Sequence, residues 1–424
     1  MRRTQAKARS AAPPPLSRLV DAPASARSEG VDGAAVPVGP EEVDADVPAA
    51  IGQALEEVLA GRLTRAGVLD AGFAEELAGR VARFTRDGGK RTRSQLLWWA
   101  MRACGGSDKA TAAAALRIGA ALELLQTCAL VHDDVMDGSA LRRGRPALHA
   151  QVRDACGGAV PASRAARFGE VAAVLAGDLA LAWADDVVAD APLAPWTVTV
   201  VREVWSDMRT EMVAGQFLDL HGQLTGSRSP AQALRAAHLK SALYSVQRPL
   251  ALGAAVAGAD GRTMRALCSA GRCVGMAFQL RDDLKDAFGD PLHTGKGSGG
   301  DIREGKPTYL AALAVARAEA AADRPALEVL QRSLGSPDLT DAGLDEVREV
   351  LVRTGARAAV EAKIERLSAQ GLRHFDGAVL DAYPADRLRR LLTALAASPG
   401  ADPAPAPSQP TGVATGSDTE GDGR

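Results

Sequence analysis

Six aspartates in two short clusters are the residues of this sequence that are best suited to chemistry. The first cluster is Asp133, Asp134 and Asp137, and the second, with the same spacing, is Asp282, Asp283 and Asp286. Residues four apart share a face of a helix, so each cluster would place its carboxylates side by side. These carboxylates repel one another unless a cation lies among them, and hard oxygen ligands favour Mg²⁺. Two such helices facing each other would enclose several Mg²⁺ ions, which a diphosphate would neutralise.

Basic residues that could hold a diphosphate lie near both clusters. Residues 88–93 read GGKRTR, and Lys90 and Arg93 would share a face if a helix begins after the glycines. Further candidates are Arg142, Arg143, Lys240 with Ser241, Lys296 and Lys306. Arginine binds phosphate oxygens with two parallel hydrogen bonds, and lysine acts as a point charge. Each basic group alone is typical of a solvated surface, and only its occurrence with two aspartate clusters indicates a phosphate site.

The elements that must position these residues are helices. Apolar residues recur three and four apart over 112–131, 168–188, 197–220 and 262–284, which is the pattern of helices that pack on one face. Few alternating β-branched runs of strand length occur. The sequence therefore predicts an all-α fold, a single large helical bundle around a central cavity.

The two ends of the chain differ from its middle. Residues 1–50 and 399–424 are rich in proline and contain no Phe, Trp or Tyr. Such segments bury too little apolar surface to offset the entropy of ordering. We therefore expect disordered tails at 1–50 and 399–424 on either side of an all-α domain at 51–398.

Composition excludes several classes of protein. The 424 residues are 46% hydrophobic and 24% charged, as in soluble globular proteins. The net charge of −2 provides no general attraction to nucleic acid. Uncharged apolar runs fall short of the ~18 residues of a transmembrane segment, and no secretory signal opens the chain. The five cysteines lack CxxC spacing, so we expect reduced thiols in a cytoplasmic protein.

Six motifs occur in a characteristic order. They are GGKRTR (88–93), LVHDDVMDGSALRRGRP (130–146), GQFLDL (215–220), KSALYSVQRPLALGA (240–254), FQLRDDLKDAFGD (278–290) and GKGSGGDIREGKPT (295–308). In this order, over residues 55–395, the sequence resembles the trans-isoprenyl diphosphate synthase (polyprenyl synthetase) family. The resemblance implies an all-α fold and usually a homodimer. It also implies the Mg²⁺-dependent, head-to-tail condensation of isopentenyl diphosphate onto an allylic diphosphate, with two or three Mg²⁺ ions per active site.

The resemblance also assigns roles by motif. Asp133, Asp134 and Asp137 resemble the first metal-binding motif, and Asp282, Asp283 and Asp286 resemble the second. The residues that resemble the isopentenyl diphosphate site are Lys90, Arg93, Gln126 and Arg143. Those that resemble the allylic diphosphate site are Arg142, Lys240, Ser241, Gln279, Lys296 and Lys306. With the metal ions, Arg142, Lys240 and Lys296 would stabilise the charge that develops on the leaving diphosphate. Two positions depart from the usual pattern, since Gln126 replaces a frequent His and Ser241 a usual Thr.

Product length would depend on the space below the first cluster. Cys128 and Ala129 precede Asp133 by five and four residues, which places them near the floor of an apolar chain pocket. Family members that stop at fifteen carbons commonly have aromatic rings there, whereas both residues here are small. We expect the twenty-carbon geranylgeranyl diphosphate, with farnesyl or a longer polyprenyl diphosphate as alternatives.

Three other functions are less compatible with the sequence. A class I terpene cyclase typically carries an Asn/Ser/Glu second metal motif and does not need the GGKRTR site. A metal-dependent phosphohydrolase that uses His132 and Asp133 would need further clustered histidines. A non-catalytic partner subunit tends to lose the aspartate motifs, and both are present here.

Overall fold

The computed structural model describes residues 39–158, 160–289 and 298–397. The first helices are α1 (Pro40–Ala45), α2 (Val47–Leu69), α3 (Ala71–Phe73), the π-helix η3 (Ala74–Ala78), α4 (Gly79–Arg86), α5 (Thr92–Ala103), α6 (Lys109–Met136), α7 (Leu148–Ala155) and α8 (Ala162–Ala189). The later helices are α9 (Val198–Thr225), α10 (Pro230–Ala237), the π-helix η4 (His238–Gln247), α11 (Arg248–Val256), α12 (Gly261–Phe288), α14 (Gly300–Glu304), α15 (Tyr309–Ala320), α16 (Arg324–Ser333), α17 (Asp341–Arg353), α18 (Ala356–Asp376) and α19 (Ala382–Ala396). Two strands of two residues, β1 (Leu141–Arg142) and β2 (Arg145–Pro146), form a small antiparallel hairpin. The predicted all-α fold is confirmed.

The two long helices α6 and α12, each of 28 residues, start in the same way. The carboxylate of Asp108 accepts a hydrogen bond from the backbone N–H of Thr111 (2.9 Å), and that of Asp260 accepts one from Thr263 (2.8 Å). These caps satisfy N–H groups that have no partner within the helix. Each helix start is thus specified by a local residue, and each aspartate cluster lies at the opposite end of its helix.

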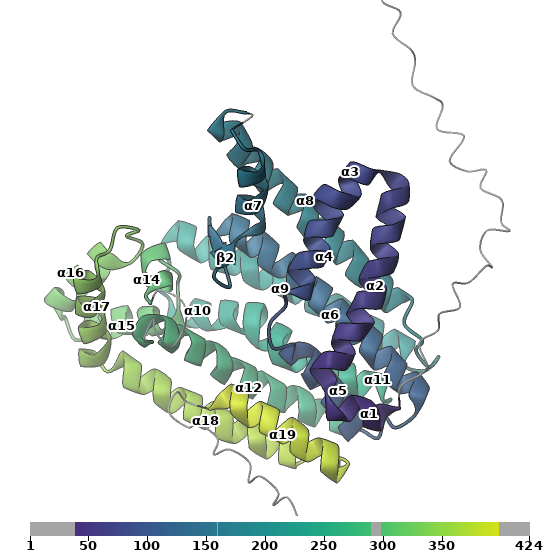
Figure 1. Cartoon of the computed structure of the whole chain (residues 1–424). Helices are drawn as coiled ribbons and strands as arrows, with labels where there is room; N and C mark the ends of the chain where they lie inside the picture. The colour runs from purple at the N-terminus through teal and green to yellow at the C-terminus, as the bar shows by residue number, and fades with distance from the viewer. Residues whose placement is uncertain (1–38, 159, 290–297, 398–424) are drawn as a thin grey trace, which may run out of the picture. The chain divides into compact units, whose positions relative to one another are not determined.

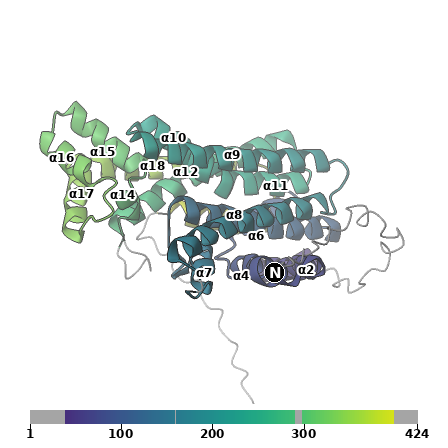
Figure 2. The same cartoon turned by 90° about the horizontal axis from the view of Figure 1, so that it is seen from above.

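The main core lies among the long helices. In it, α6 packs against α8, α5 against α11, and α12 against both η4 and α18. Figure 1 shows α12, α18 and α19 side by side, and Figure 2 shows α8 beside α6. Trp98, Trp99 and Leu122 are among its fully buried side chains. A second hydrophobic core joins the C-terminal half of α12 to α14–α18, where Leu280 and Leu284 are buried. The second aspartate cluster therefore lies on the part of α12 that faces this second core.

Helix α6 is apolar and long enough to cross a membrane by length and composition alone. However, 72% of its most apolar window is buried inside the bundle. Its apolar residues are therefore accounted for by core packing, as in the central helix of a soluble protein.

The structure corrects the predicted start of the folded domain. Residues 40–50 are almost entirely helical, and Val43 is buried. The carboxylate of Asp44 accepts a hydrogen bond from Trp98 Nε1 (2.8 Å) and forms an ion pair with Arg102 (2.9 Å). This part of the predicted tail is thus attached to α5 through a buried polar contact.

The prolines of this segment led to the wrong boundary. Pro40 and Pro48 stand in the first turns of α1 and α2. At these positions the missing N–H has no helical partner to lose, so proline favours a helix start instead of preventing it. The rest of the predicted tails, 1–38 and 399–424, lies outside the described residues, as does the final residue of the predicted domain, 398.

Candidate active site

Both aspartate clusters lie at the C-terminal ends of long helices. Asp133 and Asp134 are in the last turn of α6, and Asp137 is its C-cap. Asp282, Asp283 and Asp286 are in the last two turns of α12. The helix macrodipole concentrates partial negative charge at this end, so carboxylates here are unfavourable unless cations lie nearby.

Three cations neutralise the first cluster. Arg142 lies 2.5 Å from Asp134 and 3.3 Å from Asp133. The Lys240 ammonium is 3.2 Å from Asp133. The remaining carboxylate, Asp137, pairs with Lys306 at 2.9 Å. These cations come from β1, η4 and the segment after α14, so tertiary structure brings together residues from three distant motifs.

The pKa values of the first cluster reflect burial and these cations. Burial alone would raise the pKa of Asp133, but Lys240, Lys306 and Arg142 outweigh it and hold the pKa below its usual range. Burial raises the pKa of Asp134 despite the neighbouring Arg142, and raises that of Asp137 despite Lys306.

Hydrogen bonds hold Asp283 and Asp286 of the second cluster. Gln279 Nε2 donates to Asp283 Oδ1 (2.8 Å), and the backbone N–H of Asp301 donates to Asp286 Oδ2 (3.0 Å). Within residues 39–158, 160–289 and 298–397, neither Asp283 nor Asp286 forms an ion pair. Burial, reinforced by the negative charge of Asp301, raises the pKa of Asp283 well above its usual value.

Four predicted allylic diphosphate residues line one cavity. It has a volume of about 140 Å³, and its lining includes Lys240, Ser241, Gln279, Lys306, Asp283, Asp219 and Asp301. The cavity therefore joins a carboxylate of the second cluster to the two lysines that pair with the first cluster. Lys296, the sixth predicted contact, lies outside the described residues.

Glycines allow the helices around this cavity to approach closely. A Cβ atom on Gly215 of α9 would lie 2.3 Å from the backbone nitrogen of Lys240, and one on Gly275 of α12 would lie 2.5 Å from the carbonyl oxygen of Ala242. Only glycine permits such contacts. The close approach of α9 to η4 places Lys240 Nζ 2.8 Å from Asp219.

Two of the predicted isopentenyl diphosphate residues, Lys90 and Arg93, do not share a helical face as the sequence predicts. Helix α5 begins at Thr92, with Arg91 as its N-cap in a left-handed conformation (φ 49°). Lys90 precedes the helix and is exposed, so it does not share a helical face with Arg93. The expected shared face was wrong because the loop extends two residues beyond the glycines.

The other three candidates of this group extend from separate elements. The Arg93 guanidinium donates to Ser245 Oγ (2.8 Å) and lies 4.5 Å from the centre of the Tyr244 ring. Arg143 donates to the backbone carbonyl of Asp87 (2.8 Å). The buried Oε1 of Gln126 has no hydrogen-bond partner among the described residues, which leaves this amide available to a ligand.

Several acidic residues at this site were not singled out from the sequence. Asp219 and Glu304 lie 2.8 Å from Lys240 and Lys306, respectively. Burial, together with the charge of Asp286, raises the pKa of Asp301 to about 7. All three acids lie inside the motifs GQFLDL and GKGSGGDIREGKPT. The motifs thus contained a usable signal, since Asp219 follows Gln216 by three residues, and Asp301 and Glu304 precede Lys306 by five and two residues.

The predicted chain-length residues lie on α6, about one turn before Asp133. Cys128 is buried and Ala129 is half-buried. Burial raises the pKa of the Cys128 thiol to about 12, so this side chain stays neutral. Both side chains are therefore small and uncharged.

The donor chemistry of the site fits Mg²⁺, since both clusters supply hard carboxylate oxygens. One of them, Asp134 Oδ2, is buried without a hydrogen-bond partner in the described part of the chain. In that same part, no three His, Cys, Asp or Glu side chains gather closely enough to hold an ion. The predicted enclosure of six carboxylates is thus not preformed, because Arg142, Lys240 and Lys306 occupy the first cluster.

Comparison with known proteins identifies the family. The family model described as polyprenyl synthetase matches residues 75–345. A crystal structure of geranylgeranyl pyrophosphate synthase from Corynebacterium glutamicum, complexed with isoprenyl diphosphate and magnesium, is 34% identical, with a TM-score of 0.77 over 82% of this chain and 98% of that one. Geranylgeranyl diphosphate synthase of Methanosarcina mazei is 32% identical over 224 residues, which are 53% of this chain and 62% of that protein. Farnesyl diphosphate synthase of Geobacillus stearothermophilus is 32% identical over 273 residues, 62% of this chain and 84% of that protein.

The alignment with the Methanosarcina mazei protein thus spans less than two thirds of its length, whereas the structural match covers nearly all of the Corynebacterium glutamicum chain. The family match itself extends over more than half of the present chain and includes both aspartate clusters. This chain belongs to the polyprenyl synthetase family of prenyltransferases.

Proposed function

We propose that this protein condenses isopentenyl diphosphate head-to-tail with an allylic diphosphate in a Mg²⁺-dependent reaction. The observation that carries the proposal is that Lys240 and Lys306, which pair with Asp133 and Asp137 of the first cluster, line one polar cavity with Asp283 of the second. Carboxylates that can hold Mg²⁺, together with these cations, suit the binding and departure of a diphosphate.

The metal would be held by Asp133, Asp134 and Asp137 on one side and by Asp282, Asp283 and Asp286 on the other. Two or three bound Mg²⁺ ions would stabilise the negative charge that forms on the diphosphate as its C–O bond breaks. The protein would add Arg142, Lys240, Ser241, Gln279, Lys296 and Lys306 as donors to phosphate oxygens.

Lys306 is suited to this role because it stays charged. Burial alone would lower its pKa, but Asp301 and Asp137 outweigh burial and raise the pKa above its usual value. A charged lysine in a partly dry cavity stabilises developing negative charge more strongly than one in water.

The second substrate would be held by Lys90, Arg93, Gln126 and Arg143. Arg93 and Gln126 come from α5 and α6, whose contact is part of the main core, so their positions are set by packed helices. The C=C bond of isopentenyl diphosphate would then attack the allylic cation in a cavity that excludes water. The chain offers no obvious base in these motifs, and the released diphosphate is our candidate proton acceptor.

We infer geranylgeranyl diphosphate as the product. Cys128 and Ala129 lie about one turn before Asp133 on α6, and both are small and uncharged. They would therefore leave room for a hydrocarbon product longer than fifteen carbons. The relatives include synthases named for both the twenty-carbon and the fifteen-carbon products. The inference about product length therefore rests on Cys128 and Ala129 and not on family membership.

A product analysis tests the proposal. Purified enzyme with Mg²⁺, farnesyl diphosphate and excess isopentenyl diphosphate should form geranylgeranyl diphosphate, identified by chromatography after dephosphorylation. No hydrocarbon should form without isopentenyl diphosphate, which separates this activity from a terpene cyclase. Farnesyl diphosphate that remains unextended would exclude the twenty-carbon product, and Ala129→Phe should shift a twenty-carbon product toward fifteen carbons.

We also propose that the protein is a cytoplasmic homodimer. Helix α8 exposes apolar side chains at helical spacing, namely Phe168 (57% exposed), Val171 (45%) and Leu175 (52%). An apolar stripe of this kind is suited to burial against a second copy. The five cysteines are all free thiols, as in a reducing compartment. Light scattering should give the mass of a dimer, and Leu175→Glu should shift it toward the monomer.

A further inference from the structure

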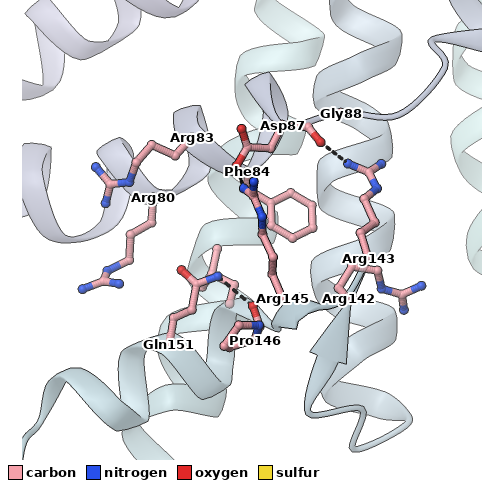
Figure 3. A pocket seen from close by; sticks show the side chains of 11 residues that line it. Arg80, Arg83, Phe84, Asp87, Gly88, Arg142, Arg143, Arg145, Pro146 and Gln151 are labelled. Carbon is pink, nitrogen blue, oxygen red and sulfur yellow. Dashed lines mark hydrogen bonds and ion pairs between the residues drawn. The ribbon is translucent and has the colours of Figure 1, made fainter. Parts of the chain in front are cut away.

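A second, larger cleft lies beside the GGKRTR segment, with a volume of about 520 Å³. Its basic lining comprises Arg80 and Arg83 of α4 and Arg142, Arg143 and Arg145 of the β1–β2 hairpin (Figure 3). Three of the residues proposed to hold isopentenyl diphosphate, Lys90, Arg93 and Gln126, are not among its lining residues. Of the described residues, the cleft shares Arg143 with that site and Arg142 with the allylic site.

The positive charge of the cleft exceeds the negative charge around it. Among the described residues that line it, only Asp87 is acidic, and Asp87 pairs with Arg145 at 2.5 Å. Arg80 pairs with Glu76 at 3.0 Å. In the part of the chain that the structure describes, Arg83 and Arg143 have no carboxylate within ion-pair distance. The cleft thus holds two guanidinium groups, those of Arg83 and Arg143, that form no ion pair with the described residues.

The hairpin is built to hold its arginines at the mouth of this cleft. Arg143 and Gly144 both have positive φ angles (55° and 74°), which form the tight two-residue turn that suits a β-hairpin. The Arg143 guanidinium donates to the carbonyl of Asp87, which ties the hairpin to the end of α4 (Figure 3). Burial, reinforced by the repulsion of Arg142 and Arg93, lowers the pKa of Arg143.

Part of the lining is apolar. Phe84, Pro146 and Leu148 line the same cleft as the arginines. A ligand that matches both the basic and the apolar part of the lining has a multiply charged phosphate or diphosphate group and a short hydrocarbon part. Paired guanidinium groups bind phosphate oxygens with two parallel hydrogen bonds.

We propose that this cleft is a peripheral diphosphate site that captures isopentenyl diphosphate before it reaches the inner site. This inference rests on the proposed function, which supplies the substrate. Arg143 lines the cleft and also belongs to the inner group, so it provides the physical link between the two sites. Inorganic diphosphate shares the charged part of the ligand and serves as a probe of the site.

Calorimetric titration of metal-free protein with inorganic diphosphate tests the site without turnover. Removing one charged hydrogen-bonding group should weaken binding at the cleft about tenfold, so in Arg83→Gln one binding event per chain should lose about tenfold in affinity relative to the unchanged protein. Arg83→Lys should retain most of the affinity. The control is Arg366→Gln on α18, which removes an exposed arginine without an ion pair in the described structure. Unchanged titration of Arg83→Gln would overturn the proposal.

Steady-state kinetics then test the role in capture. In Arg83→Gln the KM for isopentenyl diphosphate should rise about tenfold with kcat nearly unchanged, since the inner residues remain. An equal fall in kcat and kcat/KM would overturn the capture role. Phe84→Ala should weaken the binding of isopentenyl diphosphate and not that of inorganic diphosphate. If it weakens neither, the occupant is inorganic diphosphate and the capture role fails.

These outcomes are distinguishable from failure of the proposed function. The titration needs no reaction, so loss of binding in Arg83→Gln supports the peripheral site even if the product differs from geranylgeranyl diphosphate. A melting temperature equal to that of the unchanged protein shows that the variant is folded.

Discussion

The two aspartate clusters have the same spacing, yet their surroundings differ in charge. The first cluster pairs with Arg142, Lys240 and Lys306. In the second, Asp283 and Asp286 accept hydrogen bonds from Gln279 and from the backbone N–H of Asp301. The described residues offer these two carboxylates no ion pair.

This difference indicates different requirements for binding metal. In the proposed site, the carboxylates of the first cluster would exchange their ion pairs for Mg²⁺, and this exchange would free Lys240 and Lys306 to bind phosphate. Asp283 and Asp286 of the second cluster carry a desolvation cost that raises their pKa values, and protonation or a bound cation would relieve it. The neighbouring cations thus hold Asp133 of the first cluster in its charged form, whereas burial favours the neutral form of Asp283 and Asp286.

The largest effect is expected from neutralising either cluster. Asp133→Asn and Asp283→Asn should each lower kcat with saturating substrates by about three orders of magnitude, because each removes a proposed metal ligand. Asp338→Asn, an exposed change far from both motifs in sequence, should have no effect. Near-normal turnover in either cluster variant would show that its carboxylate is not part of the metal site.

A smaller effect should follow from removing the neutral donors of the clusters. Gln279→Leu takes away the hydrogen bond to Asp283 and should weaken Mg²⁺ affinity about tenfold, as expected for a residue that orients a ligand. Gln216→Leu removes a hydrogen bond of 3.2 Å to Asp133, but Lys240 and Arg142 still hold that carboxylate. Its effect should therefore be smaller, as measured by the Mg²⁺ concentration that gives half-maximal turnover. Equal effects would contradict the proposed difference between the clusters.

The smallest effect concerns stability and pH. Burial raises the pKa of Asp301 to about 7 and that of Asp283 well above 3.8. Between about pH 4 and 7 the unfolded chain loses protons that the folded protein keeps, so stability falls as pH rises through this window. The melting temperature of metal-free protein should drop by a few degrees from pH 5 to pH 8, as followed by circular dichroism.

Mg²⁺ with inorganic diphosphate should reverse this drop, because ions bound only by the folded state stabilise it. Asp301→Asn should flatten the dependence on pH. A melting temperature that rises over the same range would contradict the assigned direction of the pKa shifts.

Local patterns were sufficient to predict the fold class and the helical positions of the two aspartate clusters. The recurrence of apolar residues at three and four positions predicted helices, and the packed bundle confirms them. Both aspartate clusters lie on α6 and α12, where residues four apart share a face in any helix. The same rule failed at Lys90, because it applies only within a helix and α5 begins at Thr92.

Other features depend on partners that are distant in the sequence. The sequence does not show that Asp44 contacts Trp98 and Arg102. The prolines of residues 40–50 therefore predict a disordered tail where the structure has helices. Nor does it show that Gly215 lets α9 approach η4 closely enough for Asp219 to reach Lys240. Local spacing determines which side chains share a face, and these contacts are made between faces of different helices.

By itself, therefore, the sequence determined the helices, the two sets of carboxylates and the family. Only the tertiary structure decided how charge is distributed between the sets, because ion pairs and desolvation depend on what packs against each carboxylate. It also decided that Arg80 and Arg83 of α4 line a cleft with the arginines of the hairpin, since residues 87–140 separate α4 from the hairpin and only folding brings them together.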